Sequence, residues 1–320
     1  MGRRLLLPRR VPSQSSAPMT RFGIGEWYGK SFVSMTPAER RTLARFQMPP
    51  ARGRPAPSCP FQSSTEHAVA CNKAGGVCTL RLYEQPPSTH RAGTVLGSSG
   101  NLRTVCPNRF EQDGLIYRWV AETILGSTTP RIVSQIGFLE RVGDQGEETG
   151  GREDVGRIDK VLVVPGVSPL KWCAVEVQAV YFSGDSMAKE WPVIAGYTRR
   201  IGIPFPGGRR RPDYRSSGPK RLMPQLQIKV PSLRRWGKKM AVVIDEGFWQ
   251  AMGRMEEVPD VSNCDVAWFV VEYKEEPDGI KLGPGDVHLT TLERSVEGLT
   301  AGVPVSLEVF EQRILAKLQA

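Results

Sequence analysis

Two acidic residues in neighbouring β-rich runs are the residues best suited to chemistry. Asp159 lies in the run 157–164 and Glu176 in the run 172–182, and the turn-forming sequence PGVSPLK separates them. A symmetric hairpin over this turn places residue 159 opposite residue 176. Cross-strand partners have Cβ atoms ~4.5–5.5 Å apart, so we expect the two carboxylates to face each other.

A divalent cation would resolve the repulsion between these carboxylates. Like charges directly opposite each other destabilise a sheet. Two carboxylates and a main-chain carbonyl suit Mg²⁺, which keeps several waters, one of which can attack a phosphate. Gln178 lies on the same face as Glu176 and can hold that water or a phosphate oxygen. The pattern predicts Asp159, Glu176 and Gln178 as catalytic residues, with Asp159 and Glu176 as Mg²⁺ ligands; the alternative is a surface hairpin with unrelated polar residues.

The positive charge of the chain is confined to one segment. Residues 199–239 contain 13 Lys and Arg and one acid, so this segment carries +12 and the remainder −2 of the net +10. Such a concentration favours a polyanionic partner, although a solvated basic loop is the alternative. Its Gly-Gly, Arg-Pro and Ser-Ser-Gly-Pro sequences disfavour a compact helix, so we expect an arm that contacts DNA. The candidate contacts are Arg209, Arg210, Arg211, Arg215, Lys220 and Arg221.

Four cysteines gather in a loop-rich stretch with little hydrophobic periodicity. Cys59, Cys71, Cys78 and Cys106 are separated by 11, 6 and 27 residues, which is not the paired spacing of a zinc ribbon. In a reducing cytoplasm four such thiols favour a metal over disulfides, and a tetrahedral thiolate site suits zinc or a single iron. The alternatives are unpaired thiols, or His67 as a competing ligand.

The elements around these residues alternate between helix and strand, which predicts an α/β fold with a central mixed sheet and helices on both faces. A helix is expected to begin at Thr36, with Pro37 in its first turn and Glu39 closing a capping box. Expected strands cover residues 132–142, 157–164, 172–182, 240–244, 266–273 and 287–289, and expected helices cover residues 110–125, 247–255, 291–299 and 306–318.

Three regions follow from this pattern. Residues 1–21 are expected to be a disordered extension, residues 22–109 a lead-in with the cysteine module, and residues 110–320 a core that carries the basic arm. No apolar run approaches the ~20 residues that span a bilayer. The apolar run near the N-terminus is too short for the hydrophobic region of a secretory signal. We therefore expect a cytoplasmic protein without a membrane partner.

The motifs resemble those of a known nuclease family. Asp159, a turn and Glu-x-Gln look like a variant of the PD-(D/E)XK nuclease site, and the string EVQAVYFSG (176–184) resembles the NotI-like type II restriction endonucleases. The stretches around Cys59, Cys78 and Cys106 agree with that family. The resemblance implies a restriction-endonuclease-like core and a homodimer that cuts double-stranded DNA at a specific sequence with Mg²⁺. It also implies that Gln178 replaces the usual lysine and that the cysteines hold iron.

Some alternatives stay open at this point. Glu122, Glu140 or Glu147 can supply the further acidic residue that the superfamily often adds, and the sequence does not choose among them. A non-catalytic DNA-binding metalloprotein or an iron–sulfur regulator is the competing function, but a pure binder has no use for a carboxylate pair beside phosphates. No phosphate-binding loop surrounds Gly207 and Gly208, so no nucleotide cofactor is expected.

Overall fold

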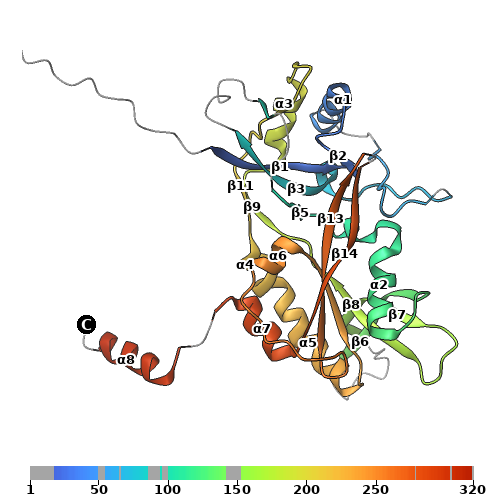
Figure 1. Ribbon diagram of the computed structural model, residues 1–320, viewed down its shortest axis with the longest axis vertical. Coiled ribbons are helices and arrows are strands. Elements are labelled where there is room, and N and C mark those ends of the chain that lie inside the picture. Colours follow the sequence, from blue (N-terminus) through green and yellow to red (C-terminus); the bar gives the residue numbers. More distant parts are fainter. Residues whose placement is uncertain are drawn as a thin grey trace, which may run out of the picture.

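Two β-sheets organise the molecule (Figure 1). The computed structural model describes residues 18–49, 55–64, 66–85, 94–95, 100–141, 153–277, 279–302 and 305–318. Most of the predicted extension lies outside the described residues, and the first strand begins at Met19, before the end predicted for the extension. None of the described helices is long and apolar enough to cross a bilayer.

The N-terminal sheet has the order β2–β1–β3–β5. Helix α1 (Pro37–Gln47) packs beside it with α3 (Glu190–Ala195), and the predicted capping box between Thr36 and Glu39 is confirmed. Trp27, Val77 and Leu80 are among the side chains that bury this sheet against the two helices. The strands are β1 (Met19–Trp27), β2 (Lys30–Ser31), β3 (Val77–Gln85) and β5 (Leu102–Thr104).

The central sheet has six strands in the order β14–β13–β12–β8–β7–β6. Strand β12 is parallel to β8 and β13, and all other neighbours are antiparallel. The mixed sheet predicted from the sequence is therefore confirmed. The strands are β6 (Arg131–Arg141), β7 (Glu153–Val164), β8 (Lys171–Val177), β12 (Met240–Asp245), β13 (Val266–Glu276) and β14 (Gly279–Thr290).

Helices cover both faces of the central sheet, as the sequence predicted. Helix α2 (Leu115–Leu125), which follows a 3₁₀ turn (Pro107–Gly114), packs on the face that contains Cys173 and Val175. The other face contains Ala174 and is covered by α5, α6 and α7. These helices span Met223–Arg235, Glu246–Gln250 and Leu292–Thr300.

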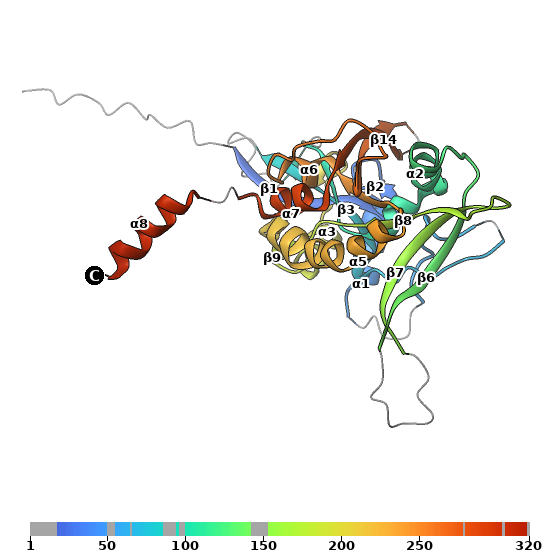
Figure 2. The same ribbon diagram turned by 90° about the horizontal axis from the view of Figure 1, so that it is seen from below.

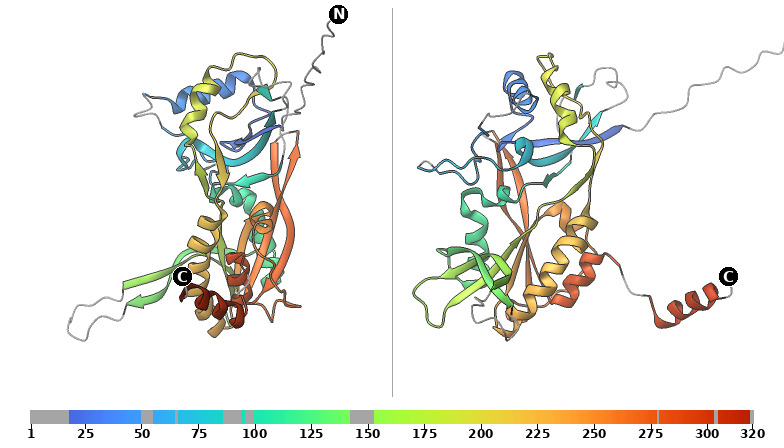
Figure 3. Two further views of the ribbon diagram at one scale, coloured as in Figure 1. Left: turned by 90° about the vertical axis from the view of Figure 1, so that its left-hand side faces the viewer. Right: turned by 180° about the vertical axis from the view of Figure 1, so that it is seen from behind.

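Strand β14 is longer than the predicted 287–289, because Pro284 and its flanking glycines hid the strand pattern. Proline is tolerated at a sheet edge, and the pairing with β13 shifts register there. The β6–β7 hairpin extends away from the body (Figure 3). Helix α8 (Leu307–Leu318) lies apart from the rest of the chain with all its residues exposed (Figure 2).

The basic segment folds differently from the extended arm that we predicted. It begins with short strands and continues through α4 (Tyr214–Ser217) and a π-helical turn (Gly218–Leu222) into α5. The prediction was wrong because Leu222, Leu226 and Leu233 recur at helical spacing and are buried. Burial of this stripe outweighs the prolines. The paired strands are β9 (Phe182–Gly184) with β11 (Arg210–Pro212), and β4 (Thr94–Val95) with β10 (Ile203–Pro204).

A buried ion pair joins the two sheets. Arg109 Nε donates to Glu26 Oε2 at 2.8 Å, and both side chains are fully buried. The same guanidinium donates to the carbonyl of Ile280 on β14, and it lies over the ring of Tyr273 on β13. The pair therefore ties β1 to the edge of the central sheet.

Removing one partner of this pair should be costly. We expect Arg109→Met to lower the free energy of unfolding by about 3–5 kcal/mol, because it leaves the Glu26 carboxylate buried without its cation. The double variant Glu26→Gln/Arg109→Met should recover part of the loss. Urea unfolding measures both, with Lys30→Met, which breaks an exposed pair with Glu39, as a control that costs at most about 1 kcal/mol. Equal losses for Arg109→Met and Lys30→Met would contradict this role.

Candidate active site

The β7–β8 hairpin has the register that the sequence predicted. Lys160 pairs with Val175 and Val161 with Ala174, and the same register continued by one residue sets Asp159 opposite Glu176. The alternation of side chains along β8 is also as predicted. Cys173 faces α2, while Glu176 points to the face that α5 covers.

Glu176 is buried against a cation that the sequence motif does not include. Its side chain is only 4% exposed, and Oε2 accepts a hydrogen bond from Lys229 Nζ at 2.7 Å. Lys229 lies on α5, is itself buried, and also donates to Gln225 Oε1 at 2.7 Å. The site is therefore assembled from a strand of the central sheet and the helix that leads into β12.

Two opposing effects act on the Glu176 carboxyl. Burial raises its pKa above the ordinary value, the Lys229 ammonium acts to lower it, and the charge of Asp159 raises it further. Asp159 itself is exposed, and it accepts a hydrogen bond from Gln135 Nε2 at 3.3 Å. One carboxylate is thus held inside the protein while the other is open to a ligand.

Gln178 follows directly after β8. Its main-chain N–H donates to the carbonyl of Val243 on β12 at 3.0 Å, which fixes the backbone beside the central sheet. Its side chain is half-buried, and Nε2 donates to the carbonyl of Ala179 at 2.6 Å. The predicted neutral amide is therefore anchored at the carboxyl end of β8.

The further acidic residue is still not identified. Glu122 is exposed on α2, which covers the sheet face opposite to Glu176, and Glu140 is exposed on β6. Glu147 lies outside the described residues. Within the described ranges no group of three or more His, Cys, Asp or Glu side chains is arranged to hold a metal. Asp159 and Glu176 thus have no third acidic neighbour of that kind there.

A sequence signal for Lys229 was present. Positions 222, 226, 229 and 233 follow one another at intervals of four, three and four, which is the spacing of one helix face. Leucine occupies three of them and lysine the fourth. A lysine inside an apolar stripe needs a buried partner. The signal was lost because the prolines in this segment argued against a helix.

The four cysteines lie in one region as two pairs. Cys59 and Cys71 flank the bridge between Ser58 and Ala70, where each donates its main-chain N–H across the bridge. Cys106 donates its main-chain N–H to the carbonyl of Cys78 at 3.2 Å. All four are free thiols.

The structure does not support the predicted four-cysteine metal site. A tetrahedral site needs sulfurs about 2.3 Å from one ion, and no three cysteines are so placed in the part of the chain that the structure describes. The reason for predicting a metal was a missing core, but Val77 and Leu80 of β3 pack into the N-terminal core.

The basic segment is attached to the chain that leaves the hairpin. The main-chain N–H of Asp213 donates to the carbonyl of Tyr181 at 2.7 Å, and the Tyr181 N–H donates to Ser217 Oγ at 2.8 Å. Arg221 lies over the half-exposed Tyr181 ring at 4.6 Å. The exposed cations among the predicted DNA contacts are Arg209, Arg211, Arg215, Lys220 and Arg221.

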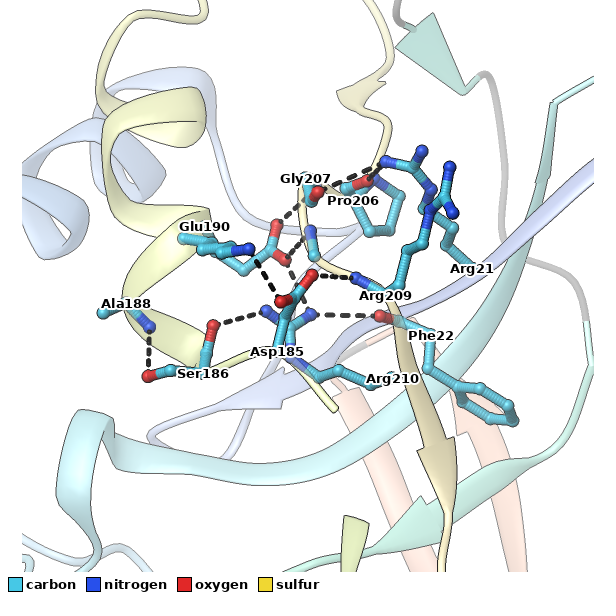
Figure 4. A network of polar contacts seen from close by, with 12 residues as sticks. Arg21, Phe22, Asp185, Ser186, Ala188, Glu190, Pro206, Gly207, Arg209 and Arg210 are labelled. Carbon is cyan, nitrogen blue, oxygen red and sulfur yellow. Dashed lines mark hydrogen bonds and ion pairs between the residues drawn. The ribbon is translucent and has the colours of Figure 1, made fainter. Parts of the chain in front are cut away.

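Arg210 differs from its neighbours, because its guanidinium is buried rather than offered to a ligand. Figure 4 shows it pointing at Glu190, to which Nη1 donates at 2.6 Å, and at the carbonyl of Ser186, to which Nη2 donates at 2.9 Å. Glu190 also accepts hydrogen bonds from the N–H groups of Gly207 and Gly208. The prediction that Arg210 contacts DNA is not compatible with this environment, since strand alternation turns it inward between Arg209 and Arg211.

Comparison with known proteins identifies the family. The model of the family described as restriction endonuclease NotI matches residues 43–282, which is three quarters of the chain and includes both the hairpin and the basic segment. A search of curated proteins finds no match. The resemblance noted in the sequence is confirmed by this match, and it favours the nuclease over the non-catalytic binder. The chain belongs to the NotI restriction endonuclease family and is a type II site-specific deoxyribonuclease.

Proposed function

We propose that this endonuclease hydrolyses phosphodiester bonds of duplex DNA in a Mg²⁺-dependent reaction at Asp159, Glu176 and Gln178. The observation that supports the proposal is the register of the β7–β8 hairpin, which pairs Lys160 with Val175 and, continued by one residue, would put Asp159 opposite Glu176. Two carboxylates on adjacent strands have no structural benefit, because like charges across a sheet repel. Their juxtaposition is therefore best explained by catalysis on a phosphate.

The donor set fits Mg²⁺ chemically. Asp159 is exposed and offers oxygen ligands, and Glu176 lies beside it on the next strand. Carboxylates and carbonyls are the ligands that Mg²⁺ accepts while keeping part of its water shell. When bound there, the ion would supply a Lewis acid to the phosphate and make a water more acidic.

The protein side chains have separate roles in this proposal. Buried Glu176 is held by the hydrogen bond from Lys229, whereas exposed Asp159 is open to the DNA backbone. Gln178 orients the attacking water or a phosphate oxygen through its amide group. Its Nε2 donates to the carbonyl of Ala179, and within the described residues no donor contacts its Oε1, which is therefore open to the water. As a neutral group it orients without adding positive charge.

The exposed cations of the basic segment would hold the DNA against this site. Arg209 directly precedes β11, and Arg211 follows the inward-facing Arg210 on that strand. Arg221 lies over the Tyr181 ring, close in sequence to Gln178. Most such arginines grip phosphates, and a few can read guanine edges with two hydrogen bonds. The catalytic residues and the DNA-contacting cations would then belong to one continuous stretch of chain.

A homodimer is the form in which we expect the enzyme to act. Two-fold symmetric proteins cut both strands of a palindrome together. Helix α8 supports self-association, because it exposes Leu307, Phe310, Ile314 and Leu318 along one face and none of its residues is buried by the rest of the chain.

The catalytic assignment predicts a clear mutational pattern. Asp159→Asn and Glu176→Gln should each slow single-turnover cleavage by a factor of about 10² or more, the usual loss when a group that stabilises the transition state is removed. Binding of duplex DNA in Ca²⁺ should survive. Quenched-flow cleavage and filter binding measure the two effects.

Glu84→Gln is the matched control, since Glu84 is an exposed carboxylate on β3 of the N-terminal sheet. It should cut at close to the wild-type rate. Wild-type cleavage by Asp159→Asn would show that the carboxylate pair is not the catalytic centre.

Substitutions at Arg209, Arg210 and Arg211 should separate DNA contacts from structural ones. Arg209→Ala and Arg211→Ala should weaken duplex binding and lower the salt slope by about one per charge removed. Arg210→Ala should instead lower the melting temperature, because it leaves Glu190 buried without its cation. Fluorescence anisotropy across a salt series, with melting curves, distinguishes them. If Arg209 and Arg211 can both become Ala without changing affinity or slope, these two arginines do not contact DNA.

The dimer proposal predicts that charge on α8 disrupts association. Phe310→Glu/Ile314→Glu should shift the protein from dimer to monomer, because it places two carboxylates in the apolar face. Glu308→Gln/Arg313→Gln, which changes two charged residues away from that face of the same helix, is the control and should stay dimeric. Analytical ultracentrifugation measures the masses, and a wild-type monomer at micromolar concentration with cognate DNA would refute the proposal.

A further inference from the structure

The buried pair of Lys229 and Glu176 is not explained by stability. Both side chains are less than a tenth exposed, and the distance from Nζ to Oε2 is 2.7 Å. Desolvating two charges costs about as much as their attraction returns, so an apolar pair of similar volume is often equally stable or more so. The rest of the stripe to which Lys229 belongs is leucine. A lysine at this position therefore points to a use other than holding α5 on the sheet.

The ammonium group of Lys229 has one N–H donor that is not used in the described structure. It has three N–H donors, and the described contacts use two of them, to Glu176 and to Gln225. The third has no acceptor in the described part of the chain. Gln225 lies one turn before Lys229 on α5, so its amide oxygen and the Glu176 carboxylate together fix the ammonium beside the carboxylate pair.

The site otherwise lacks a fixed cation. Asp159 and Glu176 bring two negative charges, and Gln178 brings none. A phosphodiester that approaches them adds a further negative charge, and cleavage increases the charge on its oxygens. Fixed donors aimed at such developing charge are worth most in a site that excludes water. Among the contacts of the three site residues, Lys229 is the one cationic side chain that the described structure shows.

We propose that Lys229 of α5 is the catalytic cation of this enzyme. It fixes the Glu176 carboxylate through one N–H and donates another to a non-bridging oxygen of the scissile phosphate. It transfers no proton and forms no covalent bond. This inference rests on the proposed function of Asp159 and Glu176, and it adds the residue that offsets the charge which the neutral amide of Gln178 leaves uncompensated.

The first test removes the charge and keeps the hydrogen bond. Lys229→Gln retains an amide donor for Glu176, so the buried carboxylate stays hydrogen-bonded and the protein remains folded. Single-turnover cleavage at saturating DNA and Mg²⁺ should fall by about 10²-fold or more, while duplex affinity in Ca²⁺ stays within about threefold and the melting temperature is checked in parallel. Lys229→Met removes both the charge and the N–H donors, so the same measurements on it show the effect of also losing the hydrogen bond to Glu176.

Moving the positive charge to a neighbouring position distinguishes a catalytic role of Lys229 from a purely structural one. In Gln178→Lys/Lys229→Gln the cation moves from α5 to the end of β8, on the same side of the sheet as Glu176. Cleavage should recover by about tenfold or more relative to Lys229→Gln, an effect that a purely structural role of Lys229 does not predict. Lys160→Met is the matched control. Lys160 is also paired with a carboxylate, Glu111, but on the α2 side of the sheet, so its loss should leave the rate within about threefold of wild type.

The outcomes distinguish the inference from the function on which it rests. If Asp159→Asn abolishes cleavage but Lys229→Gln cuts at the wild-type rate, the catalytic role of Lys229 is wrong and the proposed function stands. If Asp159→Asn also cuts at the wild-type rate, the proposed function itself fails. A Lys229→Gln loss that Gln178→Lys does not reverse at all, in a protein of unchanged melting temperature, also overturns the role assigned to the charge.

Discussion

A carboxylate buried in the central sheet must have a compensating partner, and much of the architecture meets that requirement. The side-chain alternation of β8 turns Glu176 inward, where burial raises its pKa. Lys229 of α5 neutralises this charge. The buried leucine stripe holds α5 over the sheet before the chain enters β12, and β12 pairs in parallel with β8. The buried ion pair therefore joins a strand of the central sheet to the helix that covers it.

The parts of the fold that follow local rules could be predicted from the sequence. The capping box at Thr36 needs only neighbouring residues, and Gly126 ends α2 in the left-handed conformation expected of a helix stop. The hairpin register followed from the length of one turn, because a symmetric turn leaves one pairing for Asp159. The spacing of residues along the chain was therefore enough to set the candidate carboxylates opposite each other.

The predictions from the sequence were wrong where contacts between residues distant in sequence determine the local structure. Prolines argued against a helix in the basic segment, yet burial of a leucine stripe produced α5, and Lys229 was missed with it. Arg210 looked the same as its neighbours until the pairing of β11 with β9 turned it toward Glu190. The cysteines suggested a metal because no core was visible nearby, whereas the N-terminal core depends on residues as distant as Trp191. In each case the deciding contact lies far away in sequence.

The proposed binding of a divalent cation between Asp159 and Glu176 is tested most directly by metal-directed backbone cleavage. Fe²⁺ replaces Mg²⁺, and ascorbate with peroxide generates radicals that cut the chain near the bound ion; mass spectrometry then locates the cuts. We expect cuts beside residues 159 and 176–178, and we expect these cuts to disappear in Asp159→Asn. Cuts confined to the cysteine region, or an identical pattern in wild type and Asp159→Asn, would contradict it.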